Sequence, residues 1–174
     1  MTHIKIQKGV GLVEVLVALI ILALGVLGFA ALQLRAMQAS QEATEQTVAM
    51  SAARDLAERM RVNRTALAAY KTAINNKTTY AGCDATNNIT TPKALAIPKC
   101  SSTQMAQYDA TEVLAKTLNN GQKIVIANCV KSSLNCIYVS WGKTEVKAAD
   151  LSQCIDTSTG TYIFDAKCLV LEAF

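Results

Sequence analysis

The sequence predicts an α+β fold in which one long N-terminal helix packs on a C-terminal antiparallel sheet. An apolar run near the N-terminus continues into a stretch with helical periodicity, and four short segments with strand character follow residue 123. A polar, irregular stretch separates these two parts. Helix first and hairpins later is the order typical of α+β proteins. A length of 174 residues suits one compact domain or a small domain that carries an appendage.

The composition excludes several classes of function. Hydrophobic residues make up 51% of the chain and charged residues 17%, which excludes an intrinsically disordered chain. The single histidine, His3, leaves no His-centred triad and no His-rich zinc site. No Gly-rich phosphate loop, G-x-S-x-G or H-E-x-x-H motif occurs. We therefore expect no catalytic site, no metal, no cofactor and no enzyme.

Residues 15–32 form an apolar segment of membrane-spanning length. These eighteen residues carry no polar or charged side chain, and as a helix they span about 27 Å. That length matches the hydrocarbon core of a bilayer, and the segment has no polar face that a soluble core helix would show. Lys5 and Lys8 precede it without any acid, so the positive-inside rule keeps the N-terminus in the cytoplasm. Residues 35–174 then lie on the outward side.

The helix is expected to continue well beyond the apolar segment. Neither Gly nor Pro occurs between Leu32 and Asn75. Apolar residues recur there at the i, i+3, i+4 spacing of one helical face: Val48, Ala49, Ala52, Ala53, Leu56, Ala57 and Met60. Arg54, Glu58 and Arg61 fall on the opposite side. These observations predict one continuous helix from about Leu12 to about Tyr70, whose apolar stripe packs in the core of the outward domain.

Turn signals and periodicity divide the remainder of the chain. Residues 75–101 are polar and irregular, and Ser102 or Thr103 is expected to cap a second helix that Gly121 closes. Four segments are strand candidates: 124–127, 137–141, 162–164 and 168–174. In the second of them Ile137, Val139 and Trp141 share one face, which predicts a core position for Trp141.

All six cysteines lie on the outward side, where oxidation is permitted. No pair has C-x-x-C spacing and no histidine accompanies them, which argues against a metal cluster or a redox motif. An even number predicts three disulfides among fifteen possible pairings. Short loops favour Cys83–Cys100, Cys129–Cys136 and Cys154–Cys168.

Glu14 interrupts the apolar N-terminal region. A carboxylate at membrane depth is costly, so Glu14 lies either at the headgroup boundary or beside a cation. The stretch KGVGLVEVLVAL (8–19) resembles the N-terminal signal of type IV prepilins, in which a short basic leader ends in Gly and Glu is the fifth residue after it. Counted from Val10, Glu14 is the fifth residue. Val10 and Gly11 stand where the family usually has Phe and Thr or Ser.

The resemblance implies three functional positions and a division of the chain. A prepilin peptidase would cut between Gly9 and Val10 and methylate the new amine of Val10, and Glu14 would serve assembly. Residues 1–9 would be the leader, 10–34 the transmembrane and assembly half of the helix, and 35–174 a periplasmic, disulfide-linked pilin head.

A narrower similarity extends over residues 11–40 and 105–122, which look like PilV-type minor pilins. This similarity implies a role in type IV pilus assembly or initiation, and hence in twitching motility, attachment or DNA uptake. It implies as partners the prepilin peptidase, other major and minor pilins bound through the N-terminal helix, and the inner-membrane assembly platform. The protein would cross the inner membrane once and reach the pilus surface after assembly.

Three alternatives stay open at this point. A type II secretion pseudopilin has the same N-terminus, although residues 100–142 favour the pilus. A secreted enzyme could carry a signal peptide cut near Ala30, but no catalytic constellation would remain. The outward domain could also bind DNA or act as an adhesin through exposed basic residues such as Lys143 and Lys147. The mild net charge of +4 gives a nucleic-acid partner no support.

Overall fold

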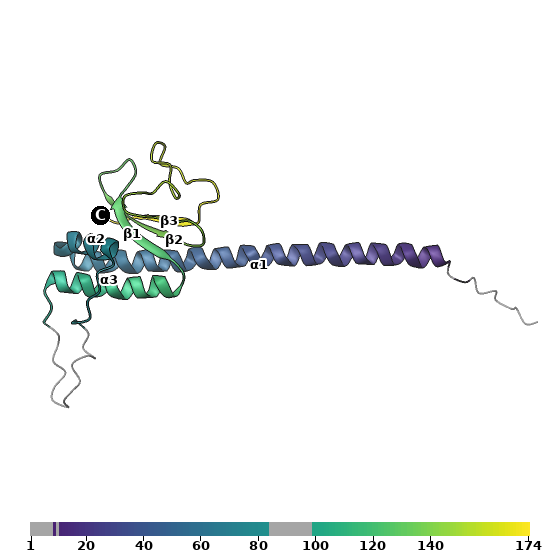
Figure 1. The fold of residues 1–174 in the computed structure, drawn as a ribbon, viewed down its shortest axis with the longest axis horizontal. Coiled ribbons are helices and arrows are strands. Elements are labelled where there is room, and N and C mark those ends of the chain that lie inside the picture. The colour runs from purple at the N-terminus through teal and green to yellow at the C-terminus, as the bar shows by residue number, and fades with distance from the viewer. Residues whose placement is uncertain (1–8, 10, 84–98) are drawn as a thin grey trace, which may run out of the picture. The chain divides into compact units, whose positions relative to one another are not determined.

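The computed structural model describes residues 9, 11–83 and 99–174, and Figure 1 shows their fold. Along the chain the elements are α1 (Leu12–Val62), the 3-10 helix η1 (Arg64–Ala66), α2 (Leu67–Asn76), α3 (Ser102–Asn119), β1 (Lys123–Asn128), β2 (Asn135–Ser140) and β3 (Cys168–Glu172). This is a long N-terminal helix with a three-stranded antiparallel sheet, so the predicted α+β class is confirmed. The chain divides into two compact units, residues 1–43 and 44–174.

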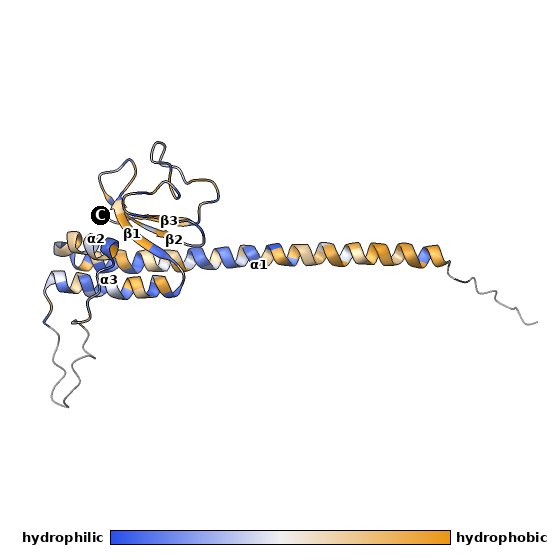
Figure 2. Ribbon diagram, viewed as in Figure 1, coloured by the Kyte–Doolittle hydropathy of each residue, from blue (hydrophilic) through white to orange (hydrophobic). Residues whose placement is uncertain are grey.

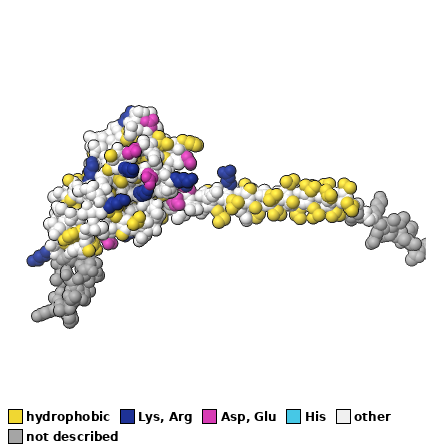
Figure 3. Space-filling view, in the orientation of Figure 1, with side chains coloured by type: hydrophobic (Ala, Val, Ile, Leu, Met, Phe, Trp, Pro, Cys, Tyr) yellow, Lys and Arg dark blue, Asp and Glu magenta, His cyan; other side chains and the backbone are white. Residues whose placement is uncertain are grey.

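The first unit consists, in its described part, almost entirely of α1. All side chains from residue 11 to residue 41 are exposed, and large apolar ones prevail as far as Met37. Figure 2 shows the N-terminal part of α1 mostly in the hydrophobic colour, and Figure 3 shows hydrophobic side chains gathered along it. Its most apolar 18-residue window has a mean hydropathy of 3.0, and none of it is buried. By length and composition this helix could cross a membrane.

The second unit, which we call the head, begins with the C-terminal part of α1. Its buried residues there are Ala49, Ala53, Leu56 and Met60, at spacings of four, three and four. These positions form one face of a helix, which confirms the predicted stripe. Arg54, Glu58 and Arg61 are exposed, as expected.

The predicted continuity of the helix to Tyr70 is wrong, because α1 ends at Val62. Asn63 adopts φ −114° and ψ 56°, and its Nδ2 donates to the carbonyl of Ser102 at 2.8 Å. The helical path resumes in η1 and α2, where Tyr70, Ala73 and Ile74 are buried. No Gly or Pro marks this break. A tertiary contact with the start of α3 accompanies it instead.

Helix α3 begins and ends with recognisable local signals. Ser101 is the N-cap: its hydroxyl accepts from the amide of Gln104 at 3.3 Å, and the Gln104 side chain accepts from the amide of Ser101 at 2.9 Å. This reciprocal pair is a capping box, one residue before the predicted cap. After Asn120, Gly121 takes φ +68°, a left-handed conformation that Gly adopts without steric cost. The predicted closing residue is therefore confirmed.

The three strands form a meander in the order β1-β2-β3, with Ile137 opposite both Ile126 and Leu171. Ile137, Val139 and Trp141 belong to the same buried cluster as the α1 stripe, which confirms the predicted face and the core position of Trp141. On the alternate positions, Cys136 and Tyr138 pack in a second cluster with residues of the 141–167 segment. Both faces of this small sheet are therefore buried.

The strand predicted over 162–164 is not formed. Tyr162 makes one isolated bridge with Ile155, and the chain then turns at Ile163–Ala166. Phe164 is 98% exposed, so this segment gains no burial from joining the sheet. The last strand also ends at Glu172, two residues earlier than predicted.

Side chains form hydrogen bonds with outward-facing backbone groups on both edge strands. On β1, Asn75 donates to the carbonyl of Ile126 at 2.8 Å and accepts from its amide at 2.9 Å. On β3, the amide of Val170 donates to the hydroxyl of Tyr162 at 3.2 Å. These contacts cover points at which another strand could pair.

The six cysteines form three disulfides, Cys83–Cys100, Cys129–Cys136 and Cys154–Cys168. This is the pairing that the short loops favour. Since all six are used, the chain has no free thiol.

Candidate functional site: the N-terminal assembly segment

The candidate site lies at the start of α1. The helix begins directly after Gly11, whose carbonyl accepts from the amides of Glu14 at 3.0 Å and Val15 at 3.3 Å. Glu14 therefore stands in the first helical turn, where the partial positive charge of the helix N-terminus favours a carboxylate. Its side chain is exposed. Among the described residues, no cation forms an ion pair with it.

The structure places only part of the predicted site. Gly9 is exposed, and no neighbouring side chain or backbone atom lies within 4 Å of where its Cβ would stand. Val10, the predicted site of cleavage and methylation, lies outside the described residues. Cleavage at Gly9–Val10, methylation of Val10 and the assembly role of Glu14 thus remain predictions.

The surface that follows Glu14 is chemically uniform. Leu16, Ile20, Leu24 and Leu27 are 51–67% exposed, and their neighbours around the helix are equally apolar. Burying such a side chain completely is worth about 1.5–3 kcal/mol relative to water. A surface of this kind is stable in lipid or against other apolar helices, and Glu14 is the acid at its N-terminal end.

A polar network in the head ties three helices together, and sequence analysis missed it. Arg59 of α1 contacts Asp55 at 2.8 Å and Asp109 of α3 at 2.6 Å. The hydroxyl of Tyr70, on α2, donates a short hydrogen bond to the other oxygen of Asp109. Lys116 of α3 completes the network at 3.1 Å from Asp55. The pair Asp55–Arg59, four residues apart beside the apolar stripe, was the one local signal for it.

The network shifts the pKa values of several of its members, among them Asp55 and Tyr70. Burial by itself raises the pKa of Asp55, but the hydrogen bonds and charges of Arg59 and Lys116 outweigh it, and the pKa lies below its ordinary value. Burial, the hydrogen bond to Asp109 and the charge of Asp109 all raise the pKa of Tyr70 well above 10.0. Tyr70 therefore stays protonated and serves as a hydrogen-bond donor to a buried carboxylate.

The described residues contain no group of three or more His, Cys, Asp or Glu side chains placed to hold a metal ion. The geometry offers an apolar helix with an acidic N-terminal turn, carried by a head that disulfides and buried charges hold together.

Comparison with known protein families finds two similar segments in the first 111 residues. Residues 4–30 match the prokaryotic N-terminal methylation motif, and residues 31–111 match the family of the type IV pilin Tt1218. The first match contains Gly9, Val10 and Glu14, and the second contains the buried stripe of α1. No curated protein and no solved structure matches the chain. The chain thus contains a segment similar to the N-terminal methylation motif, followed by a segment similar to the family of the type IV pilin Tt1218.

Proposed function

We propose that this protein is a minor pilin, processed at its N-terminus and assembled through α1 into a type IV pilus. The observation that carries the proposal is the coincidence of the methylation motif at residues 4–30 with an exposed apolar helix that has Glu14 in its first turn. The role is structural rather than catalytic. Partners are the prepilin peptidase, which the motif implies, then other pilins and the inner-membrane assembly platform.

Leader removal would prepare the helix for assembly. Cleavage after Gly9 deletes Lys5 and Lys8, whose charges hold the N-terminus at the cytoplasmic face, and frees the amine of Val10. When apolar helices bundle together, Glu14 leaves both water and headgroups, and an unpaired carboxylate there is strongly unfavourable. The amine of Val10 on a neighbouring subunit is the cation that cleavage makes available. Processing would thus create the charge that Glu14 requires.

Before assembly the protein would span the inner membrane once, with residues 35–174 in the periplasm. The exposed apolar surface of α1 and the two lysines ahead of it support this topology. The three disulfides support an oxidising compartment for the head.

A type II secretion pseudopilin is the second candidate, because the methylation motif is common to both systems. The match of residues 31–111 to a type IV pilin family favours the pilus. Similarity to PilV-type minor pilins over residues 11–40 and 105–122 favours the minor-pilin role. A head that binds DNA or an adhesive ligand is compatible with either assembly.

The mature N-terminus tests the proposal most directly. Mass spectrometry of the protein purified from membranes should find a chain that starts at Val10 and carries one added methyl group. A start at Ala31 would identify a conventional secreted protein, and a retained Met1 would identify an unprocessed membrane anchor. Either result would overturn the pilin assignment.

Deletion of the gene separates the two assembly systems. Loss of sheared surface pili with normal release of exoproteins is the result expected for a pilus subunit. The reverse result would identify a pseudopilin.

A further inference from the structure

An apolar turn projects from the head within the segment that the Cys154–Cys168 disulfide closes. The amide of Ala166 donates to the carbonyl of Ile163 at 3.1 Å, which closes a four-residue turn with Phe164 and Asp165 at its centre. Phe164 is 98% exposed. Asp165 takes φ +59°, a left-handed conformation that Asp adopts more readily than most residues. We call Phe164 and Asp165 the knob.

The knob stands on a braced support. The Cys154–Cys168 disulfide closes the segment that carries it, and the amide of Ile163 donates to the carbonyl of Cys154 at 3.0 Å. The hydroxyl of Tyr162 binds the amide of Val170 in β3 at 3.2 Å. These contacts hold the backbone that carries the exposed Phe164 ring, so docking of the knob would cost little backbone conformational entropy.

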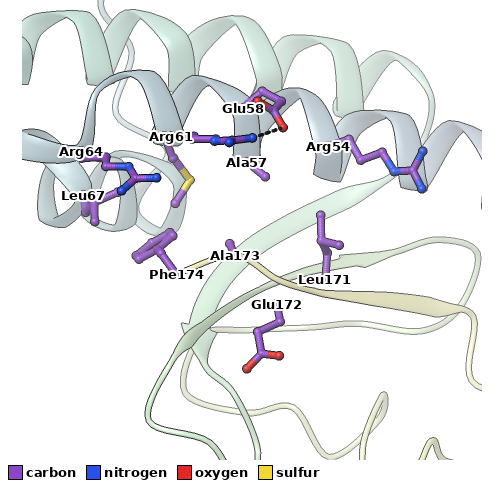
Figure 4. Close-up of a pocket in the computed structure, with 11 residues that line it drawn as sticks. Arg54, Ala57, Glu58, Arg61, Arg64, Leu67, Leu171, Glu172, Ala173 and Phe174 are labelled. Atoms are coloured by element: carbon purple, nitrogen blue, oxygen red, sulfur yellow. Dashed lines mark ion pairs between the residues drawn. The ribbon is translucent and has the colours of Figure 1, made fainter.

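A groove elsewhere on the head has an apolar lining that could accept the apolar ring of the knob. It lies between the C-terminal turns of α1 and the end of the chain and encloses about 770 Å³ (Figure 4). Its apolar lining comprises Ala57, Met60, Leu67, Leu171, Ala173 and Phe174. No residue of the knob lines it, and Phe164 is almost fully exposed, so the knob does not occupy the groove of its own head.

The charges of knob and groove are complementary. Arg54, Arg61 and Arg64 line the groove together with Glu58 and Glu172. Arg61 lies 3.8 Å from Glu58, but Arg54 and Arg64 have no ion-pair partner among the described residues. The carboxylate of Asp165 has none in this part of the chain either. The knob thus combines an exposed apolar ring with a carboxylate that has no ion-pair partner in the described part of the chain. The groove combines an apolar lining with two guanidinium groups that lack such a partner there as well.

We infer that the knob of one copy of this chain docks in the groove of a second copy, with Phe164 on the apolar lining and Asp165 beside Arg54 or Arg64. Knob and groove are different surfaces of one head, so the contact is heterologous: each copy offers one surface and leaves the other free. Such a contact extends an open chain of heads. It involves only the head and needs neither Glu14 nor leader cleavage.

Site-specific photocrosslinking of the full-length chain in detergent tests this contact. Phe164 is replaced by p-benzoylphenylalanine in one copy, which is mixed with a second, affinity-tagged copy. We expect covalent dimers whose crosslinks map to residues 54–67 or 171–174 of the tagged copy. The same probe at Leu118, which is 75% exposed and does not line the groove, should give no crosslink there.

Charge variants test the pairing at the rim. Asp165→Asn keeps the size of the side chain and the tolerated left-handed conformation, and it should lower the dimer yield about three- to fivefold, as should Arg64→Glu combined with Arg54→Glu. Lys143→Glu, a matched charge reversal of an exposed basic residue outside the groove, should not lower the dimer yield. Asp165→Lys should recover yield on the Arg54→Glu, Arg64→Glu background.

Two results would overturn the inference: crosslinks that map elsewhere or do not form, and a charge exchange that fails to recover yield in variants whose Trp141 fluorescence shows a folded head. Glu14→Ala keeps this test separate from the proposed function. Dimers that persist when this variant no longer assembles would support the contact on its own. Pili that assemble from chains forming no such dimers would refute the contact and leave the function standing.

Discussion

Glu14 and Tyr70 show how single polar groups are handled in two different parts of this protein. Tyr70 has its partner within the head, where its hydroxyl binds the carboxylate of Asp109. Glu14 has the favourable field of a helix N-terminus and no ion-pair partner in the described part of its chain. In the proposed assembly, a charge that is tolerated in the free subunit but not in a dry helix bundle would make docking depend on a second molecule.

The first prediction concerns Glu14. Glu14→Ala should leave membrane insertion and leader cleavage intact but lower incorporation into pili at least about tenfold, a loss of about 1.4 kcal/mol in docking free energy. Glu14→Gln should behave in the same way, because it keeps the shape and removes the charge. The ratio of assembled to membrane-embedded protein, measured by quantitative crosslinking, checks this. Normal assembly of both variants would show that no charge pair forms.

The second prediction concerns Tyr70. Tyr70→Phe leaves an oxygen of the buried carboxylate of Asp109 without its donor, so the head should lose about 1–3 kcal/mol of unfolding free energy at pH 7. The fluorescence of Trp141, the chain's single tryptophan and a buried one, reports unfolding of the head alone.

The pH dependence of the same network follows from the signs of its pKa shifts. The pKa of Tyr70 is raised in the fold, so its contribution is complete below about pH 10 and decreases above it. Stability of the wild type should therefore fall above pH 10 more steeply than that of Tyr70→Phe. The pKa of Asp55 is lowered, so its contribution is present above its unfolded value of 3.8 and is lost in more acidic solution. Parallel alkaline curves for wild type and Tyr70→Phe would contradict this account.

At the scale of elements, local patterns predicted what depends on local contacts. The 48–60 stripe, the alternation of Ile137, Val139 and Trp141, and the glycine that closes α3 all follow from periodicity or backbone sterics. The break at Asn63 does not, because its side chain binds Ser102, 39 residues away. The segment 162–164 has strand-like residues, yet Tyr162 binds the edge of β3 through its hydroxyl instead of its backbone.

The functional residues also divide into those that the sequence could predict and those that it could not. The position of Glu14 could be counted from Gly9 in the sequence. The network of Arg59, Asp109 and Tyr70 could not be found, since its partners come from three helices and lie 39 and 50 residues apart. Phe164 was predicted to lie in a strand over residues 162–164 because a sequence pattern records which side chains are apolar but not which ones the fold leaves exposed to water.

The third prediction tests the start of α3. Ser101→Ala removes the acceptor for the amide of Gln104 and should cost about 1 kcal/mol of head stability. Ser101→Asp, which keeps an acceptor at the N-cap, should recover most of that loss. Thermal unfolding of both variants followed by Trp141 fluorescence measures it. Equal stability of Ser101→Ala and wild type would show that tertiary contacts alone fix this helix end.

At the scale of the whole molecule, the head has to stabilise a small sheet with a limited core. Helices cover one face, and the irregular 141–167 segment covers the other. An irregular cover makes few regular backbone hydrogen bonds, so its position depends on the Cys154–Cys168 bond and on side-chain packing. The disulfides therefore belong to the support of the fold rather than to its chemistry.

The fourth prediction follows from this arrangement. Replacing Cys154 and Cys168 together by serine should cost about 3 kcal/mol, the value expected for a closed loop of roughly 15 residues, and should lower the midpoint of head unfolding by on the order of 10 °C. The native protein should also resist alkylation until it is reduced. Complete labelling of unreduced protein would show that the cysteines are not paired in the cell.

The contacts of Asn75 and Tyr162 with the sheet edges affect how the heads behave when many of them are close together. In the proposed pilus, neighbouring heads would be held far closer together than free proteins in solution. Backbone pairing between bare strands is indifferent to sequence, so crowded sheets with open edges tend to fuse into β-aggregates. The side-chain amide of Asn75 binds both outward backbone groups of Ile126, and the hydroxyl of Tyr162 binds the amide of Val170. These backbone groups are then not available to pair with another strand. Contacts between neighbouring heads are thereby left to side chains, which can be selective and can separate again.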